Sequence, residues 1–121
     1  MRLLIILCLV LLSSCSPPDG PYETFHEDGQ LSERGTYIDG EFDGLFEKFY
    51  EDGQLWVREN YIDGERDGLR EFFYINGQLG IRGNYIDGKK DGLWEDFDTN
   101  GNLTKTETWE NGEVVEYNLN P

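Results

Sequence analysis

The sequence predicts an all-β protein: an elongated antiparallel meander of β-hairpins made of four 24-residue repeats, preceded by a signal-peptide helix. Three observations predict this fold. Similar sequence motifs recur at a constant interval, as "TYIDGEFDGL" at 36–45, "NYIDGERDGL" at 60–69 and "NYIDGKKDGL" at 84–93. Runs rich in β-forming residues lie between Asp-Gly pairs. Glycine also recurs too often to leave room for a stable helix after the start of the chain.

The first segment is typical of a targeting signal. Met1 and Arg2 precede "LLIILCLVLL", ten apolar residues where a membrane-spanning helix needs about 20. The next stretch, "LSSC" at 12–15, resembles the lipobox of bacterial lipoproteins, which implies cleavage between Ser14 and Cys15 and a lipid on Cys15. The alternative is an ordinary secretory signal. We expect a signal peptide over 1–14, a lipidated Cys15 and a tether to residue 19.

The repeats follow, and they predict one domain over 20–115. The units are 20–43, 44–67, 68–91 and 92–115, with 116–121 left as a C-terminal tail. The residues that recur at the 24-residue period include Gly20, Gly44, Gly68 and Gly92, and Phe25, Phe49, Phe73 and Phe97. A fixed period of this kind indicates an array in which each unit stacks on its neighbours.

Each unit is predicted to be a hairpin. A type I′ turn at Asp52 and Gly53 would place Tyr50 opposite Leu55 and Glu47 opposite Arg58. If successive units also stack without stagger, a ladder of alternating charge results. Its members are Glu23, Arg34, Glu47, Arg58, Glu71, Arg82 and Glu95. Each cross-strand pair contributes about 0.2–1 kcal/mol, so we expect the ladder to fix register rather than to catalyse.

The second connection in each unit, "IDGERDG" in one copy, contains Asp-Gly twice. A four-residue loop would keep the units unstaggered, whereas a tight turn at either Asp-Gly would shift the register. The sequence leaves these alternatives open.

Charge and composition restrict the partners. The net charge of −15 disfavours nucleic acid and anionic lipid surfaces, which need cationic patches, and suits a basic protein or metal cations. Three Trp, seven Tyr and seven Phe argue against disorder.

Catalytic chemistry is not expected. His26 is the single histidine, and its slot holds Tyr50, Tyr74 and Asp98 in the other units, which indicates a half-exposed strand position rather than a general base. We expect no enzyme activity, no cofactor and no metal. Calcium is the alternative to weigh, because Asp pairs recur at the turns. Turn geometry explains these residues more simply. They are Asp39 and Asp43, Asp63 and Asp67, and Asp87 and Asp91.

Large aromatic residues interrupt the repeat and supply the candidate binding surface. Trp56, Phe72 and Trp94 stand where other units carry different residues, and Tyr50 and Tyr74 accompany them. A single-layer ribbon cannot cover both of its faces, and exposed apolar patches mark contacts with partners. We therefore predict that these five residues contact a partner.

The segment "FYEDGQLWVRENYIDGERDGL" and its copies resemble the MORN-variant repeat. This repeat is found in bacterial proteins of the YwqK kind that are described as toxin–antitoxin system antitoxins. The resemblance implies a scaffold or protein-binding array, here a lipid-anchored module at the bacterial cell envelope, in either membrane or at the cell surface. An antitoxin-like or immunity role is the first alternative. Cell-wall glycan binding is the second, because choline-binding repeats are also hairpin arrays, although their aromatic cages do not recur here.

Overall fold

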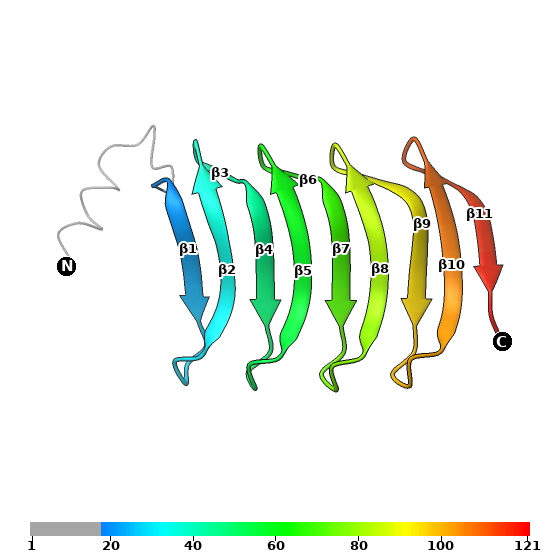
Figure 1. Ribbon diagram of the computed structural model, residues 1–121, viewed down its shortest axis with the longest axis horizontal. Helices are drawn as coiled ribbons and strands as arrows, with labels where there is room; N and C mark the ends of the chain where they lie inside the picture. The colour runs from blue at the N-terminus through cyan, green and yellow to red at the C-terminus, as the bar shows by residue number, and fades with distance from the viewer. Residues whose placement is uncertain (1–17) are drawn as a thin grey trace.

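A computed structural model describes residues 18–121 of the chain, which form one antiparallel sheet. The strands are β1 (Gly20–Phe25), β2 (Leu31–Ile38), β3 (Glu41–Phe42), β4 (Gly44–Phe49), β5 (Leu55–Ile62), β6 (Glu65–Arg66), β7 (Gly68–Phe73), β8 (Leu79–Ile86), β9 (Lys89–Phe97), β10 (Leu103–Glu110) and β11 (Glu113–Leu119). The long strands lie side by side in chain order, and the short β3 and β6 pair with β2 and β5 (Figure 1). The predicted hairpin meander is therefore confirmed.

The predicted signal peptide, with Ser14 and Cys15, lies outside the described residues. Within 18–121, no helix is long and apolar enough to cross a bilayer.

The predicted ladder is present with the predicted register. Glu47 lies opposite Arg58 within its hairpin, and Arg58 lies opposite Glu71 of the next unit. The other partners are Glu23 with Arg34, Arg34 with Glu47, Glu71 with Arg82, Arg82 with Glu95, Glu95 with Thr106 and Asp96 with Lys105. Successive units stack without stagger, so equivalent side chains form rows along the sheet.

The turn at Asp52 and Gly53 is not the type I′ turn that the sequence predicts. Only Gly53 has positive φ (89°), and its N–H donates to the Tyr50 carbonyl at 2.9 Å. Asp52 instead accepts a hydrogen bond from the Gln54 N–H through its side chain, at 3.0 Å. This is a type I turn followed by a left-handed glycine, a common hairpin connection with a bulge.

The bulge changes the pairing next to this turn. Leu55 pairs with Phe49 rather than with Tyr50, and a shift between Lys48 and Phe49 restores the predicted register farther along the strands. The ladder is therefore unaffected by the difference in turn type.

The type I′ turns occur in the second connection, and they settle the alternatives left open by the sequence. Asp63 (φ 49°) and Gly64 (φ 81°) form a two-residue turn that pairs Ile62 with Glu65. An irregularity then returns the chain to the unstaggered register, and the Asp67 N–H donates there to the Asn60 carbonyl at 2.9 Å. A tight turn and an unstaggered stack therefore coexist, because the second Asp-Gly pair absorbs the shift.

The C-terminal boundary predicted at residue 115 is too early. Residues 116–119 belong to β11, in which Glu116 pairs with Thr108 and Leu119 with Lys105. The segment expected to be a tail is therefore the last strand of the sheet.

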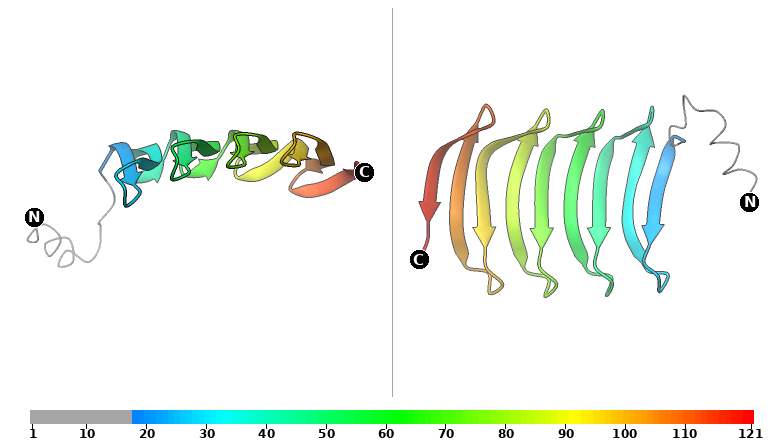
Figure 2. Two further views of the ribbon diagram at one scale, coloured as in Figure 1. Left: turned by 90° about the horizontal axis from the view of Figure 1, so that it is seen from below. Right: turned by 180° about the vertical axis from the view of Figure 1, so that it is seen from behind.

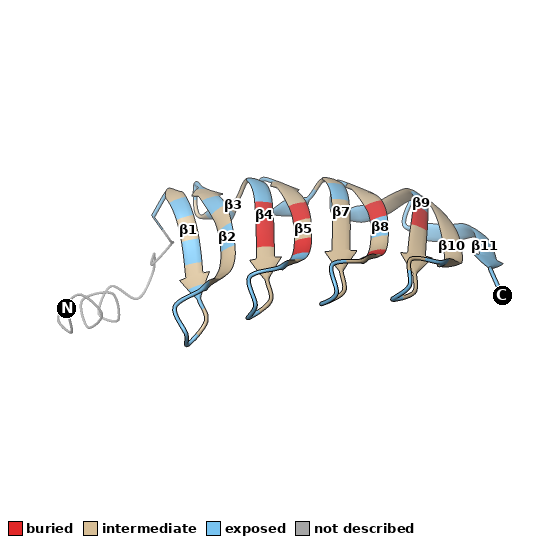
Figure 3. Cartoon of the chain, turned by 60° about the horizontal axis from the view of Figure 1, so that its bottom comes forward, coloured by how far each residue is buried: buried red, intermediate tan, exposed pale blue. Residues whose placement is uncertain are grey.

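Figure 2 shows a thin layer, and the buried residues lie in its middle strands (Figure 3). The buried apolar side chains are Phe46, Val57 and Trp94, and the buried charged ones are Glu47 and Glu59. Within the described sheet no second layer covers either face, so both faces are available to a partner.

Candidate functional site

The two faces of the sheet carry different side chains, and we name them by these. Strand alternation places Phe46, Val57, Phe72 and Trp94 on one side, the aromatic face. The Glu/Arg ladder occupies the other side, the ladder face.

At the N-terminal end of the aromatic face, rings pack directly on one another. Tyr37 stacks on Phe42 with 4.4 Å between ring centroids, and Phe42 lies 4.7 Å from Phe46. Tyr22 and Tyr61 join this cluster by edge-on contacts with Tyr37 and Phe46. These rings are mutually covered and supply internal packing.

Two junctions between units on this face pair glycine with a large ring. A Cβ on Gly35 would lie 2.8 Å from Phe46, and one on Gly83 would lie 2.0 Å from Trp94. Glycine is required at these positions because the ring of the next unit occupies the space over the backbone.

The intervening junction uses a charge pair at the equivalent positions. Buried Glu59 accepts a hydrogen bond from Arg70 at 3.1 Å and another from Arg66 at 2.8 Å. The Tyr61 hydroxyl also donates to Glu59, at 3.1 Å. Burial is the main cause that raises the pKa of Tyr61, and the nearby Glu59 carboxylate adds to it. Each junction thus has its own complementary pair.

The structure brings together four of the five predicted binding residues. Trp56 stacks on Tyr50 at 5.4 Å, and Phe72 makes an edge-on contact with Tyr74 at the same distance. The pairs lie in neighbouring units, because Val57, which follows Trp56, pairs with Phe72. Trp56 is 39% exposed, so this platform of Tyr50, Trp56, Phe72 and Tyr74 presents an indole to solvent.

The two tyrosines of the platform are held by the next unit. The Tyr50 hydroxyl donates to the Phe73 carbonyl at 2.7 Å, and the Tyr74 hydroxyl donates to the Phe97 carbonyl at 2.8 Å. These bonds fix the rings in place, so the two side chains lose less conformational entropy when a partner binds.

Trp94, the fifth residue, lies apart from the platform. It is 3% exposed and packs edge-on against Tyr85 at 5.1 Å. The ammonium group of Lys90 lies 4.3 Å from the Trp94 ring and 4.7 Å from the Trp109 ring. Trp94 therefore contributes to the interior of the sheet, and its indole is not available as a contact surface.

His26 occupies the slot of Tyr50 and Tyr74 and makes the same connection. Its Nε2 lies 3.0 Å from the Phe49 carbonyl of the next unit, to which it donates. Asp98 fills this slot in the last unit and instead accepts hydrogen bonds from the N–H groups of Asn100 and Asn102 at 2.9 Å. The slot requires a donor only where another hairpin turn follows.

Close ion pairs join several members of the ladder. Buried Glu47 lies 2.7 Å from Arg34 and 3.2 Å from Arg58, and Arg82 lies 2.7 Å from Glu95. The contact between Arg58 and Glu71 is longer, at 3.9 Å. The guanidinium groups of Arg34 and Arg82 also lie over the rings of Phe49 and Phe97.

Sequence reasoning missed two aliphatic rows on the ladder face. Each of their six side chains is between 44% and 55% exposed. The rows consist of Leu45, Leu69 and Leu93, and of Ile38, Ile62 and Ile86. The signal was present, because each leucine precedes a ladder Glu by two residues and each isoleucine follows a ladder Arg by four, which places them on the ladder face.

The excess negative charge lies in the turns along the two long edges. The turns between the strands of each hairpin contain Glu27, Asp28, Glu51, Asp52 and Asp98, and no Lys or Arg. At the other edge the Asp39 N–H donates to Asp19 at 2.7 Å, and the Asp87 N–H donates to Asp67 at 3.1 Å. These aspartates therefore hold successive turns together.

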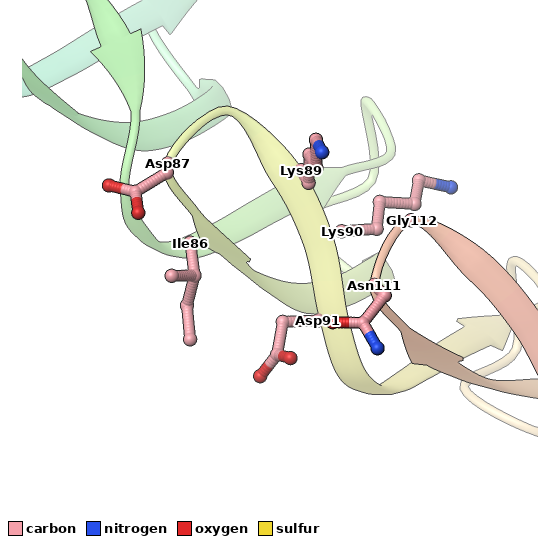
Figure 4. Close-up of a pocket in the computed structure, with 7 residues that line it drawn as sticks. All are labelled: Ile86, Asp87, Lys89, Lys90, Asp91, Asn111 and Gly112. Atoms are coloured by element: carbon pink, nitrogen blue, oxygen red, sulfur yellow. The ribbon is translucent and has the colours of Figure 1, made fainter.

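No group of three or more His, Cys, Asp or Glu side chains within 18–121 is placed to hold a metal ion. A shallow hollow lies between the β8–β9 turn and the turn at Asn111 and Gly112 (Figure 4). Its side chains, among them Asp87, Lys90 and Asp91, point in different directions and do not converge on one ligand.

The family described as MORN repeat variant matches residues 18–39, 42–63 and 90–111, which together exceed half of the chain. Among curated proteins, no relative matches significantly.

Similar solved structures include a crystal structure of TarM, with a TM-score of 0.47, 16% identity and coverage of 95% of this chain. Another is a mutant of S. aureus TarM in complex with fondaparinux, alpha-GlcNAc-glycerol and UDP, with a TM-score of 0.48, 16% identity and coverage of 93% of this chain. The chain spans 23% of the length of either structure.

Proposed function

The chain belongs to the MORN repeat variant family, and from this premise we propose that it is a non-enzymatic protein-binding module, held at the bacterial cell envelope by a lipid on Cys15. The observation that carries the proposal is the platform on the aromatic face, where the Trp56 indole, stacked on half-buried Tyr50, remains exposed in a sheet that buries Trp94. Tryptophan and tyrosine are the residues that most often dominate protein interfaces.

The surroundings of the platform favour a basic partner. Glu51 and Asp52 follow Tyr50 directly in an exposed turn, and the neighbouring turn adds Glu27 and Asp28. A Lys or Arg of the partner can lie on the Trp56 indole and reach these carboxylates, which combines a cation–π contact with charge attraction. The same carboxylates repel nucleic acid, so we do not expect it to bind.

A photo-crosslinking experiment tests the platform. Trp56 is replaced by p-benzoylphenylalanine in the full chain, expressed in its own bacterium, and Tyr117 is replaced likewise as the control. Tyr117 is an exposed aromatic residue on β11, at the far end of the sheet. We expect one covalent partner from position 56 that is missing from position 117.

Binding of that partner is then measured with Trp56→Ala and Tyr117→Ala. Truncation of a central aromatic residue weakens binding by about 30-fold or more, whereas the control stays within about twofold. Equal crosslinking from both positions, or equal affinity of both variants, would refute the platform as the binding site.

The anchor is tested separately. Cys15→Ser in the full chain removes the only acceptor proposed for the lipid, so the protein should lose the added mass and be released from membranes when the signal is processed. One acyl chain alone binds membranes marginally, and the two or three chains of a lipoprotein make the anchor stable. Unchanged mass and membrane retention would rule out lipidation at this residue.

An antitoxin-like or immunity role is the second candidate, and the acidic turn edges favour it. Five carboxylates without a neighbouring cation line one edge, which suits the neutralisation of a basic toxic protein. The crosslinked partner decides between the two functions: an antitoxin requires that the partner be toxic alone and that an equimolar amount of this chain abolish the toxicity.

A further inference from the structure

We propose that the ladder face pairs with the ladder face of a second copy of this chain, so that two sheets form a sandwich about a twofold axis. This surface is opposite to the aromatic platform, so the inference stands independently of the proposed partner. A single-layer sheet that exposes apolar rows on one face gains most by covering them with another sheet.

The first supporting observation is the distribution of apolar side chains. The Leu and Ile rows lie on one side of the ladder, and the Phe row, which includes Phe49 and Phe97 beneath the ladder arginines, lies on the other. None of the six aliphatic side chains is buried by the sheet itself. The ladder is therefore flanked on both sides by apolar rows. This is the arrangement of an interface in which apolar rows supply the buried area and charged residues fix the register.

The second observation is that the ladder is complementary to itself. The ladder, with Thr106 at its end, runs across eight strands, from β1 to β10 without the short β3 and β6. The midpoint of these eight strands lies between β5 and β7. A twofold axis parallel to the strands at this midpoint places Arg58 opposite the partner's Glu71. The same operation places Glu47 opposite the partner's Arg82 and Arg34 opposite the partner's Glu95, with Glu23 opposite the partner's Thr106.

Every charged contact between the two ladders is therefore between opposite charges, and each occurs twice by symmetry. The aligned strands also match the usual geometry of packed sheets, which lie about 10 Å apart.

Charge balance identifies the occupant as a copy rather than an unrelated basic protein. The ladder holds four Glu and three Arg, whereas the whole chain has a net charge of −15. The ladder is thus close to neutral, with both signs in strict alternation. A surface that alternates in sign fits another surface that alternates with the same spacing, and the chain itself supplies one.

The aliphatic rows provide the first test. The full chain, 14.0 kDa by sequence, is kept in a non-ionic detergent, and its protein mass is followed against concentration by light scattering with the detergent contribution subtracted. We expect a dimer, and Leu69→Ser should weaken dimerisation at least about tenfold. Ile75→Ser is the matched control, because Ile75 is also an exposed aliphatic residue but lies in the turn between β7 and β8.

A charge exchange tests the register. Arg34→Glu and Glu95→Arg should each weaken dimerisation about tenfold or more, because each places like charges opposite each other twice. An equimolar mixture of the two variants should regain the wild-type mass, since the mixed dimer restores an opposite-charge pair at both ends. Arg34 and Glu95 lie on β2 and β9 and do not touch within one chain, so the recovery can arise only between copies.

Circular dichroism of each variant shows whether the sheet remains folded. A wild-type chain that stays monomeric up to about 100 µM would overturn the proposal. So would a dimer that survives Leu69→Ser unchanged, or a mixture no heavier than either charge variant alone.

Discussion

The two faces of this sheet differ in how strictly they repeat. On the aromatic face, the equivalent positions at three successive junctions hold Gly35 with Phe46, then Glu59 with Arg70, then Gly83 with Trp94. On the ladder face the same Glu, Arg, Leu and Ile return in nearly every unit. Outside the platform around Trp56, the varied face is packed against itself, whereas the Leu and Ile rows of the repeated face are exposed.

This difference separates internal packing from external presentation. A junction can be closed by any pair whose shapes or charges are complementary, so the aromatic face varies from unit to unit without loss. A surface that meets another regular surface has to keep both its spacing and its chemistry. The exposed rows of Leu and Ile contribute little to the stability of one chain, and their repetition is explained by a regular partner.

Neighbouring residues on β9 provide the sharpest way to break this comparison, and the largest expected effect. Trp94→Ala should lower the free energy of unfolding by about 3–5 kcal/mol, because a buried indole is lost and a cavity remains. Leu93→Ala, one residue earlier and 55% exposed on the ladder face, should cost about 0.5 kcal/mol or less in a monomer. Chemical denaturation of dilute protein measures both, and similar losses would show that the two faces are not energetically distinct.

A smaller effect is expected at Gly83, where the neighbouring ring allows no side chain. Gly83→Ala should destabilise by about 1–3 kcal/mol, since the new Cβ would overlap the Trp94 indole and force it to move. In the Trp94→Ala background the same change should cost much less, because the obstructing ring is gone. A double-mutant cycle from denaturation curves gives the coupling between the positions. Additive losses would mean that shape complementarity does not govern this junction.

Much of this fold could be predicted from the sequence because its period is undisturbed. A fixed interval and an alternating strand pattern determine which side chains share a face, so the pairing of Glu47 with Arg58 follows from counting alone. The type of each turn was harder to predict from the sequence. Asp-Gly occurs at both ends of a unit, and only the structure shows left-handed φ at Asp63 but not at Asp52.

The site was predicted only in part, for physical reasons. Counting places Trp56 and Trp94 on a strand but does not reveal which is covered. The answer depends on what lies across the junction: Gly83 leaves a space that the Trp94 ring fills, whereas Trp56 stacks on Tyr50 near an exposed turn. The aliphatic rows were missed because each residue looks ordinary within its own unit, and their significance lies in alignment across units.

The smallest predicted effect concerns acid stability near the C-terminal end of the sheet, where Glu107 lies on β10, next to the last strand. Burial alone would raise the pKa of Glu107, but hydrogen bonds from Lys105 and Trp109 lower it below its ordinary value. A carboxyl whose pKa is depressed by folding stabilises the protein above its unfolded pKa of about 4.3, and this contribution disappears as the pH falls through the lower folded value. Glu107→Gln should therefore reduce stability by about 0.5–1 kcal/mol at pH 7 and by progressively less below about pH 4. Denaturation curves between pH 7 and pH 3 measure this convergence, with Glu110→Gln as a control for the loss of an exposed carboxylate on the same strand. A Glu107→Gln deficit that remained constant down to pH 3 would show that the lost side chain matters through packing, and that its charge does not stabilise the end of the sheet.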